Sequence, residues 1–181
     1  MVKSAYSFAT KKEKVESHII VVWVDNESGA LARVVGLFSG RGYNIDSLAV
    51  AEVDKKRNVS RITISTSGTP QVLQQIKLQL RKLIPVHKVA DFPNNKKTLM
   101  RELALLKIVS TKTQLEKAKK LCKKYKYAIL DKTEKSFVFE ISALKKEVDD
   151  LIKKLQPLGL ASASRTGVVA MTKGHETFKW T

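Results

Sequence analysis

Residues 18–25, HIIVVWVD, decide the fold. A run that is β-branched and apolar almost throughout predicts a strand that is buried on both faces. Residues 26–29 interrupt the run, and from Leu31 to Phe38 the apolar side chains recur at helical spacing. Gly40 and Gly42 then end a predicted helix over residues 30–41. A strand, a polar turn and an amphipathic helix therefore follow one another directly.

The downstream patterns complete two units with the same order of elements. For the first unit they predict further strands at residues 44–53, 61–67 and 86–92 and a helix from Pro70 to about Leu83. For the second unit they predict helices over residues 115–125 and 144–155 and strands at residues 103–109, 127–130, 137–141, 160–164 and 167–171. The order βαββαβ occurs twice although the residues do not repeat. The sequence thus predicts an α+β protein built of two ferredoxin-like units.

Composition predicts where these units begin and end. Residues 93–98 are polar and rich in turn formers, which indicates a linker between units at residues 18–92 and 99–174. Residues 1–17 form a basic extension and residues 175–181 a tail. The extension lacks the apolar segment of a secretory signal, and it has two glutamates and no arginine, unlike a transit peptide. We therefore expect a cytoplasmic protein.

An antiparallel sheet with both helices on one side leaves its other face and one edge exposed. Dimerisation is a common way to cover such surfaces, so the predicted fold favours a dimer.

The charge of the chain raises the question of nucleic-acid binding. Among 181 residues, 34 are Lys or Arg and 17 are Asp or Glu, which gives a net charge of +17. The excess is spread evenly, and only seven of the basic residues are arginine, the residue that base and phosphate recognition favours. Phe137 and Phe139 share a face of one predicted strand, as stacking aromatics on an RNA-binding sheet do, although filling the core is the alternative. An RNA-binding protein of two ferredoxin-like domains is the alternative function.

Catalytic and metal-binding patterns are not apparent in the sequence. The single cysteine, Cys122, excludes a disulfide framework and a multi-thiolate metal site. None of the three histidines is spaced as part of a ligand pair, and Asp149 and Asp150 are adjacent on a predicted helix, so they point in different directions. The longest apolar run is far shorter than the roughly 20 residues that span a bilayer. We therefore expect neither an active site nor a membrane segment.

Residues 25–31, DNESGAL, carry a binding signal. The first turn of a helix has free N–H donors and a partial positive charge, which suit a carboxylate. Gly29 would let a ligand approach the backbone, and the Asn26 amide offers a donor and an acceptor. In the alternative interpretation Ser28 caps the helix, Gly29 turns the chain and Asn26 holds the loop. A second turn, residues 41–45, ends the same helix and could meet the first only across a subunit interface.

Three blocks of sequence carry a family resemblance: residues 25–34 (DNESGALARV), 36–39 (GLFS) and 41–48 (RGYNIDSL). They resemble the ACT domain of the acetolactate synthase (acetohydroxyacid synthase) small subunit. The likeness continues in residues 60–64, 101–107 and 164–170 and extends over residues 18–174. It implies an N-terminal ACT domain followed by an ACT-like domain. The chain departs from the family at Asp25, where many members have Glu, in its basic extension and in its lysine-rich second unit.

The resemblance also implies a function. Such subunits are non-catalytic homodimers that bind and activate a large subunit carrying thiamine diphosphate, magnesium and FAD. The holoenzyme is a transferase that condenses pyruvate with pyruvate or 2-oxobutyrate in branched-chain amino-acid biosynthesis. Valine, or another branched-chain amino acid, binds between two ACT domains and inhibits it. No nucleic acid and no membrane are involved.

Carried over to this sequence, the family's effector site comprises residues from two protomers. Asn26, Gly29, Ala30 and Leu31 would hold the effector from one protomer, and Asn44 and Ile45 would complete the pocket from the other. A stand-alone amino-acid sensor that controls a different enzyme is a third possibility.

Overall fold

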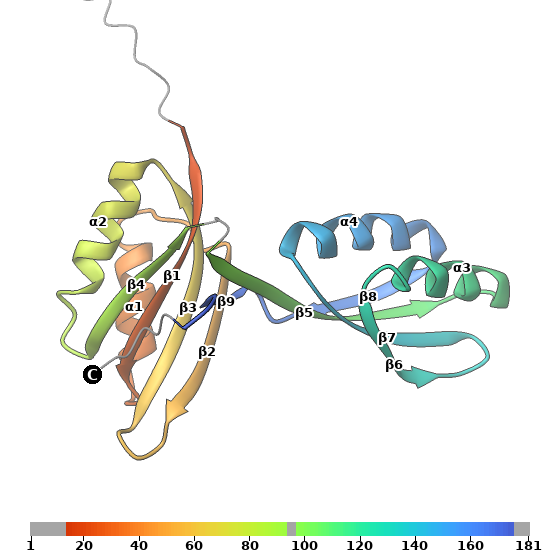
Figure 1. Cartoon of the computed structure of the whole chain (residues 1–181), viewed down its shortest axis with the longest axis horizontal. Coiled ribbons are helices and arrows are strands. Elements are labelled where there is room, and N and C mark those ends of the chain that lie inside the picture. The colour runs from red at the N-terminus through yellow and green to blue at the C-terminus, as the bar shows by residue number, and fades with distance from the viewer. Residues whose placement is uncertain (1–13, 94–96, 176–181) are drawn as a thin grey trace, which may run out of the picture.

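A computed structural model describes residues 14–93 and 97–175, which form two units lying side by side (Figure 1). The first unit contains β1 (Glu16–Asp25), α1 (Ala30–Ser39), β2 (Ser47–Asp54), β3 (Val59–Gly68), α2 (Pro70–Leu80) and β4 (Val86–Pro93). The second contains β5 (Thr98–Val109), α3 (Lys112–Cys122), β6 (Lys126–Lys132), β7 (Ser136–Ala143), α4 (Lys145–Leu155), a 3₁₀ turn (Gln156–Leu158) and β8 (Leu160–Arg165), and β9 (Val169–Thr172) follows it. The α+β class and the two βαββαβ units are confirmed.

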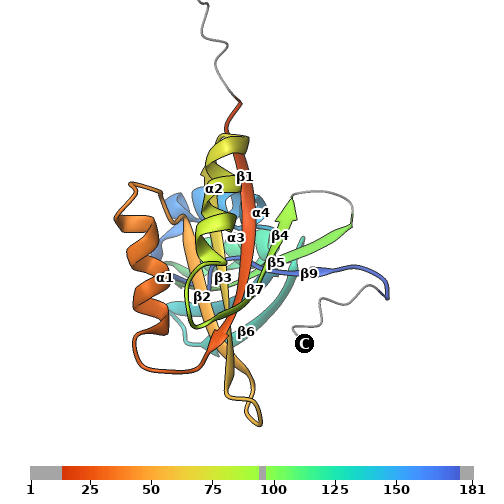
Figure 2. The same ribbon diagram turned by 90° about the vertical axis from the view of Figure 1, so that its left-hand side faces the viewer.

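Each unit is an antiparallel sheet with its two helices on one face. The strand order is β2-β3-β1-β4 in the first sheet and β6-β7-β5-β8 in the second. Figures 1 and 2 show α1 and α2 beside each other on one face of the first sheet. Both helices bury an apolar stripe there, which contains Val34 and Phe38 of α1 and Ile76 and Leu80 of α2. The layer architecture follows from these stripes, because each helix must cover apolar surface.

Strand β1 is buried on both faces, as its sequence predicts. Ile20 and Val22 contact the helical core, whereas Val21 and Trp23 belong to a cluster on the opposite face of the sheet. That cluster includes Val168, which immediately precedes β9, and Ala170, which lies within β9. We expected a second copy to cover this face, but part of it is covered by the chain's own C-terminal strand. The outer edge of β2 has no neighbouring strand within the described residues.

Two strands begin three or more residues away from the predicted position. β5 begins at Thr98 instead of residue 103, because its first residues pair with β9, from Thr98 opposite Thr172 to Arg101 opposite Val169. β2 begins at Ser47 instead of residue 44, because its pairing with β3 starts at Ser47.

The predicted extension, linker and tail fall largely outside the described residues. The structure does not describe residues 1–13, 94–96 and 176–181. Pro93 is the last residue of β4 and Thr98 the first of β5, so the two ends of the predicted linker lie in strands.

Phe137 and Phe139 fill the core of the second unit. Their side chains are 4% and 0% exposed, and the two rings meet edge to face with centroids 5.9 Å apart. Both belong to one apolar cluster with residues of α3 and α4, so they face the helices and are not open to stacking bases. Cys122 lies in the same cluster as a small apolar side chain.

Burial raises the pKa of the Cys122 thiol to about 12, so the thiol stays protonated in the folded chain. We expect it to resist alkylation at about pH 8 and to react once the chain unfolds.

Since only the unfolded state ionises between about pH 9 and 12, the free energy of unfolding falls as the pH rises through this range, by up to about 1.4 kcal/mol per pH unit. Urea titrations across this range measure the loss. A Cys122→Ala control should lack this part of it, and equal losses in both proteins would contradict the prediction.

Candidate functional site

Gly29 is the residue that turns β1 into α1. It is the N-cap of α1 with φ +85°, a left-handed conformation that favours glycine, and no side chain caps the helix. The interpretation in which Ser28 caps the helix is therefore wrong. Within the described part of the chain, no group accepts a hydrogen bond from the backbone N–H of Leu31 or Ala32. The first turn of α1 thus presents free donors at its positive end, as an anion site requires.

Asn26 anchors this turn to the neighbouring strand. Its backbone N–H donates to the Asn58 carbonyl at 2.7 Å, and its side-chain oxygen accepts from the Ser60 hydroxyl at 3.0 Å. Asn26 therefore does hold the loop, as one interpretation predicts. Its Nδ2 has no acceptor among the residues that the structure describes, so the same amide remains able to donate to a ligand.

The acidic side chains at the turn are all engaged with cationic or ionisable partners. Asp25 Oδ1 lies 2.7 Å from Nε2 of His87, and Glu27 Oε1 accepts from Nη1 of Arg33 at 3.2 Å. The positive charge of Arg33 offsets the negative charge of Glu27, which would otherwise repel a carboxylate at the start of α1.

Ala30 and Leu31 contribute differently to the predicted site. The Ala30 side chain is 3% exposed and belongs to the core, so only its backbone can face a ligand. Leu31 is 40% exposed and lies open on α1, where it is available to a ligand or to another protein.

The second turn lies at the other end of α1. Asn44 donates from Nδ2 to Asp46 Oδ1 at 2.7 Å, and its carbonyl accepts from the Thr66 hydroxyl at 2.6 Å. Ile45 is half-buried and packs against the core of the first unit. Asn44 is thus held in place while its side-chain oxygen has no donor among the described residues.

Within one chain the two turns do not meet. α1 has 10 residues, which at 1.5 Å per residue separates its ends by about 15 Å. The structure brings Asn26, Gly29, Ala30 and Leu31 together at one end and Asn44 and Ile45 at the other. Any shared pocket needs a second copy, and its composition stays a prediction.

Two cavities in the described regions are lined by residues other than the six of the predicted site. One of about 820 Å³ lies at the far end of the second unit, between the start of α3 and the β6–β7 hairpin. Another, of about 340 Å³, lies beside the second turn and is lined by Asp46, Ser47 and Arg165. The sequence alone gave no signal for this second cavity, because its walls come from both units.

Residues 14–93 and 97–175 contain no cluster of three or more His, Cys, Asp or Glu side chains placed to hold a metal ion. Among these residues, no helix has the length and apolar character needed to cross a membrane.

Comparisons with known proteins match both units and nearly the whole chain. The family model for the AHAS small subunit-like ACT domain matches residues 20–88, and the model for the small subunit of acetolactate synthase matches residues 101–174. The acetolactate synthase small subunit of Haemophilus influenzae is 37% identical over 159 residues, which cover 87% of this chain and 96% of that protein. The acetolactate synthase isozyme 3 small subunit of Escherichia coli K12 is 34% identical, with 89% and 98% covered.

A solved structure agrees with these relatives. The crystal structure of the acetolactate synthase small subunit from Thermotoga maritima superposes with a TM-score of 0.79 at 29% identity, over 88% of this chain and 99% of that chain. The resemblance inferred from residues 25–48 is confirmed. Since fold, family models and full-length relatives all agree, the chain belongs to the family of acetolactate synthase small subunits, which are regulatory subunits with an N-terminal ACT domain.

Proposed function

We propose that this chain binds and activates a catalytic acetolactate synthase subunit and makes it sensitive to feedback inhibition by valine or another branched-chain amino acid. The catalytic partner would carry thiamine diphosphate, magnesium and FAD. The observation that supports the effector role most directly is the turn before α1, where the N–H groups of Leu31 and Ala32 and the Nδ2 of Asn26 are free to donate. These are the donors that a carboxylate needs.

A free amino acid has complementary groups for the two turns. Its carboxylate would accept from Asn26 Nδ2 and the first amides of α1, and its ammonium group would donate to the side-chain oxygen of Asn44. Leu31 and Ile45 would flank its apolar side chain. The anchoring of Asn26 to β3 and of Asn44 to Asp46 fixes both amides before binding, which reduces the entropy lost on binding.

A homodimer through the β2 edge would bring the two turns together. Asn44 precedes the start of β2, whereas Asn26 bonds to Asn58, in the hairpin that follows the end of β2. Antiparallel pairing of two β2 edges places the start of one strand beside the end of the other. The first turn of each copy would then face the second turn of its partner.

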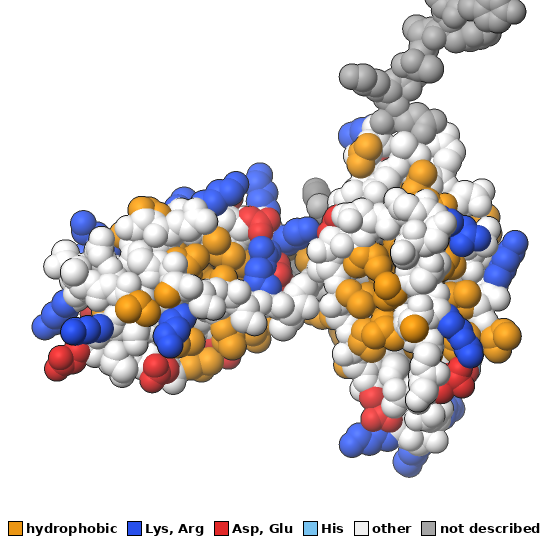
Figure 3. All heavy atoms as spheres, turned by 180° about the vertical axis from the view of Figure 1, so that it is seen from behind, with side chains coloured by type: hydrophobic (Ala, Val, Ile, Leu, Met, Phe, Trp, Pro, Cys, Tyr) orange, Lys and Arg blue, Asp and Glu red, His pale blue; other side chains and the backbone are white. Residues whose placement is uncertain are grey.

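Exposed apolar side chains on this side of the molecule support such a dimer. Leu31 of α1 and Val50 of β2 are 40% and 45% exposed. Figure 3 looks onto α1 and the β2 edge and shows hydrophobic side chains gathered on the first unit. Lysines and arginines are spread over both units in this view, in accord with their even distribution along the sequence.

Reconstitution tests the proposed function. Adding the full chain to a catalytic acetolactate synthase subunit from the same source should raise the rate of acetolactate formation, and valine, leucine or isoleucine should reverse this increase. The two proteins should also co-purify. No activation, together with no co-purification, would reject the proposal, and salt-sensitive retention of RNA would support the alternative instead.

Substitutions at Gly29 test the effector site. A Cβ at this position meets no atom within 4 Å, so the cost to the fold is the left-handed backbone alone, about 1 kcal/mol. Gly29→Asp should abolish valine binding, because its carboxylate would stand where the effector carboxylate docks. Gly29→Asn has almost the same shape and backbone strain without the charge, so it should retain binding within about tenfold of the wild type. Calorimetry measures both, and equal binding by the two variants would refute the assignment.

Val50→Lys tests the proposed dimer. The charged side chain would be buried at the seam between the two copies, so the dimer should dissociate at least about 100-fold more readily. Analytical ultracentrifugation measures this change. Ile84→Lys is the matched control, since Ile84 is 94% exposed and precedes β4, which lies at the opposite edge of the sheet from β2. A Val50→Lys protein that dimerises like the control would place the interface elsewhere.

A further inference from the structure

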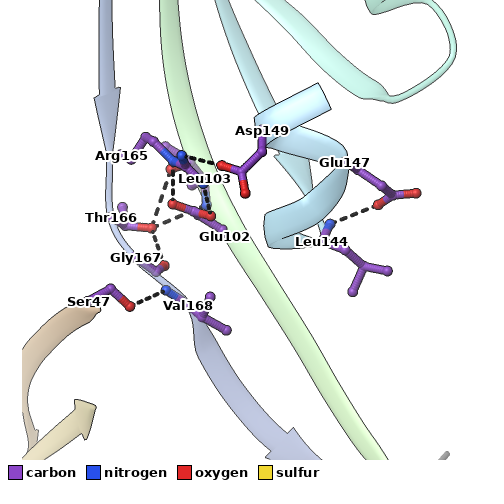
Figure 4. Close-up of polar contacts among 10 residues, drawn as sticks. All are labelled: Ser47, Glu102, Leu103, Leu144, Glu147, Asp149, Arg165, Thr166, Gly167 and Val168. Carbon is purple, nitrogen blue, oxygen red and sulfur yellow. Dashed lines mark hydrogen bonds and ion pairs between the residues drawn. The ribbon is translucent and has the colours of Figure 1, made fainter. Parts of the chain in front are cut away.

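Residues 165–168, which we call the junction segment, lead from β8 to β9 and touch both units (Figure 4). This stretch begins on the second unit and ends against the first sheet. Its side chains and backbone make defined contacts with β5 and α4 on one side and with the start of β2 on the other.

Arg165 ties the junction segment firmly to the second unit. Its Nε and Nη2 donate to the two carboxylate oxygens of Glu102 on β5, each at 2.7 Å, and its Nη1 donates to Asp149 Oδ1 on α4 at 2.6 Å. Glu102 is only 3% exposed, so the carboxylate of this bidentate pair is shielded from water, while the Arg165 side chain is 28% exposed. The next residue, Thr166, exchanges hydrogen bonds with the backbone of Leu103.

Gly167 and Val168 both lie against Ser47 of the first unit, and the Val168 side chain also packs on the first sheet beside Val21 and Trp23. The Val168 N–H donates to the Ser47 hydroxyl at 3.4 Å. Gly167 has φ +78°, and a Cβ built on it would lie 2.9 Å from the Ser47 Cβ and 3.1 Å from its hydroxyl. Because Gly167 lies so close to Ser47, a displacement of either residue is transmitted to the other.

Ser47 is connected to the predicted effector turn through Asp46. Asp46 accepts from Asn44 Nδ2 at 2.7 Å through one carboxylate oxygen and from Ser67 at 3.0 Å through the other. Contacts therefore run without a gap from Asn44 through Asp46 and Ser47 to the junction segment, and from there to β5 and α4.

Space on both sides of the junction segment permits movement. A cavity of about 340 Å³ is lined by Ser47, Lys145 and Arg165, and another of about 350 Å³ by Ser65, Met100 and Asp149. Each cavity has walls from both units. The units are thus joined at the junction segment and at the contacts of β9, while beside them the interface is unfilled and leaves room for reorientation.

We propose that the junction segment couples the effector turn at Asn44 and Ile45 to the orientation of the second unit, with Gly167 as the contact point and Arg165 as a positioning residue. This inference rests on the proposed function, because it requires an effector at those two residues. Effector binding would shift Ser47 against Gly167, and Arg165 would carry the shift to β5 and α4. Coupling of this kind needs an element with two arrangements that the ligand biases.

A glycine pair tests the contact point in the holoenzyme. Gly167→Ala adds a methyl group against Ser47, whereas Gly174→Ala imposes the same left-handed strain, at φ +75°, with no atom within 4 Å of the new Cβ. Both variants should bind valine within about twofold of the wild type by calorimetry. The fraction of activity that saturating valine removes should fall to less than half of the wild-type value in Gly167→Ala and stay unchanged in Gly174→Ala. Adding Ser47→Gly to Gly167→Ala removes the clashing side chain and should restore inhibition.

An aspartate pair tests Arg165 without exposing a buried charge. Asp149→Asn weakens one contact of Arg165 and leaves the Glu102 pair intact, and Asp150→Asn changes the next residue on α4, for which the structure describes no ion pair. Asp149→Asn should lose at least half of the inhibition while Asp150→Asn keeps it. This pair decides the matter if Gly167→Ala fails to fold by circular dichroism.

The outcomes separate the two proposals. Valine binding and full inhibition in both Gly167→Ala and Asp149→Asn would overturn the coupling role and leave the proposed function standing. A wild-type protein that binds no valine, leucine or isoleucine would overturn the coupling role and the effector part of the proposed function, whereas activation of the catalytic subunit is tested separately by reconstitution. Loss of inhibition with binding retained, in these variants and not in their controls, would support the junction segment as the coupling element.

Discussion

Strand β1 is buried on both faces, and the rest of the architecture follows from that burial. Side chains alternate along a strand, so Ile20 and Val22 point to one layer and Val21 and Trp23 to the other. α1 and α2 supply the first layer within the unit itself. The second layer has to come from elsewhere, and Val168 and Ala170 help to supply it from the C-terminal end of the chain. Docking of the two units is therefore part of how β1 is buried.

The burial of β1 explains which parts of the fold the sequence predicts well. An unbroken apolar strand, a helical stripe and a polar turn are local patterns, and all three occur in the first unit where residues 18–41 predict them. The early start of β5 and the role of β9 are different, because residues 98–101 pair with residues 169–172 far along the chain. No local pattern distinguishes a strand that covers the sheet of another unit from a strand that completes the sheet of its own unit. The sequence consequently predicts that the open face of the first sheet needs cover, but assigns it to a second copy.

The candidate site, like the fold, has features that the local sequence predicts and features that it does not. The glycine at the start of α1 and the role of Asn26 in the loop follow from residue types and spacing, and the structure confirms both. The capping role of Ser28 is wrong because Gly29, in the left-handed conformation, takes the N-cap position and leaves the amides beyond it unpaired. That difference matters chemically, since a serine cap would satisfy one of the donors a ligand needs. The contribution of Asn44 and Ile45 depends on a partner chain, which neither the sequence nor a single protomer contains.

The contacts of the junction segment differ in strength on its two sides. On the second unit it is held by a bidentate ion pair between Arg165 and the buried carboxylate of Glu102. The hydrogen bonds that Arg165 donates to Glu102 and Asp149, together with the negative charge of these two carboxylates, raise the Arg165 pKa, so the guanidinium stays charged. On the first unit its hydrogen bond to Ser47 has an N–O distance of 3.4 Å, near the limit for such a bond. The hydrogen bonds of the segment are therefore stronger towards β5 and α4 than towards β2, while Val168 packs on the first sheet beside Val21 and Trp23. A ligand that binds next to Ser47 acts on the weaker of these hydrogen-bonded contacts. A small free-energy difference is enough there to shift the equilibrium between two arrangements.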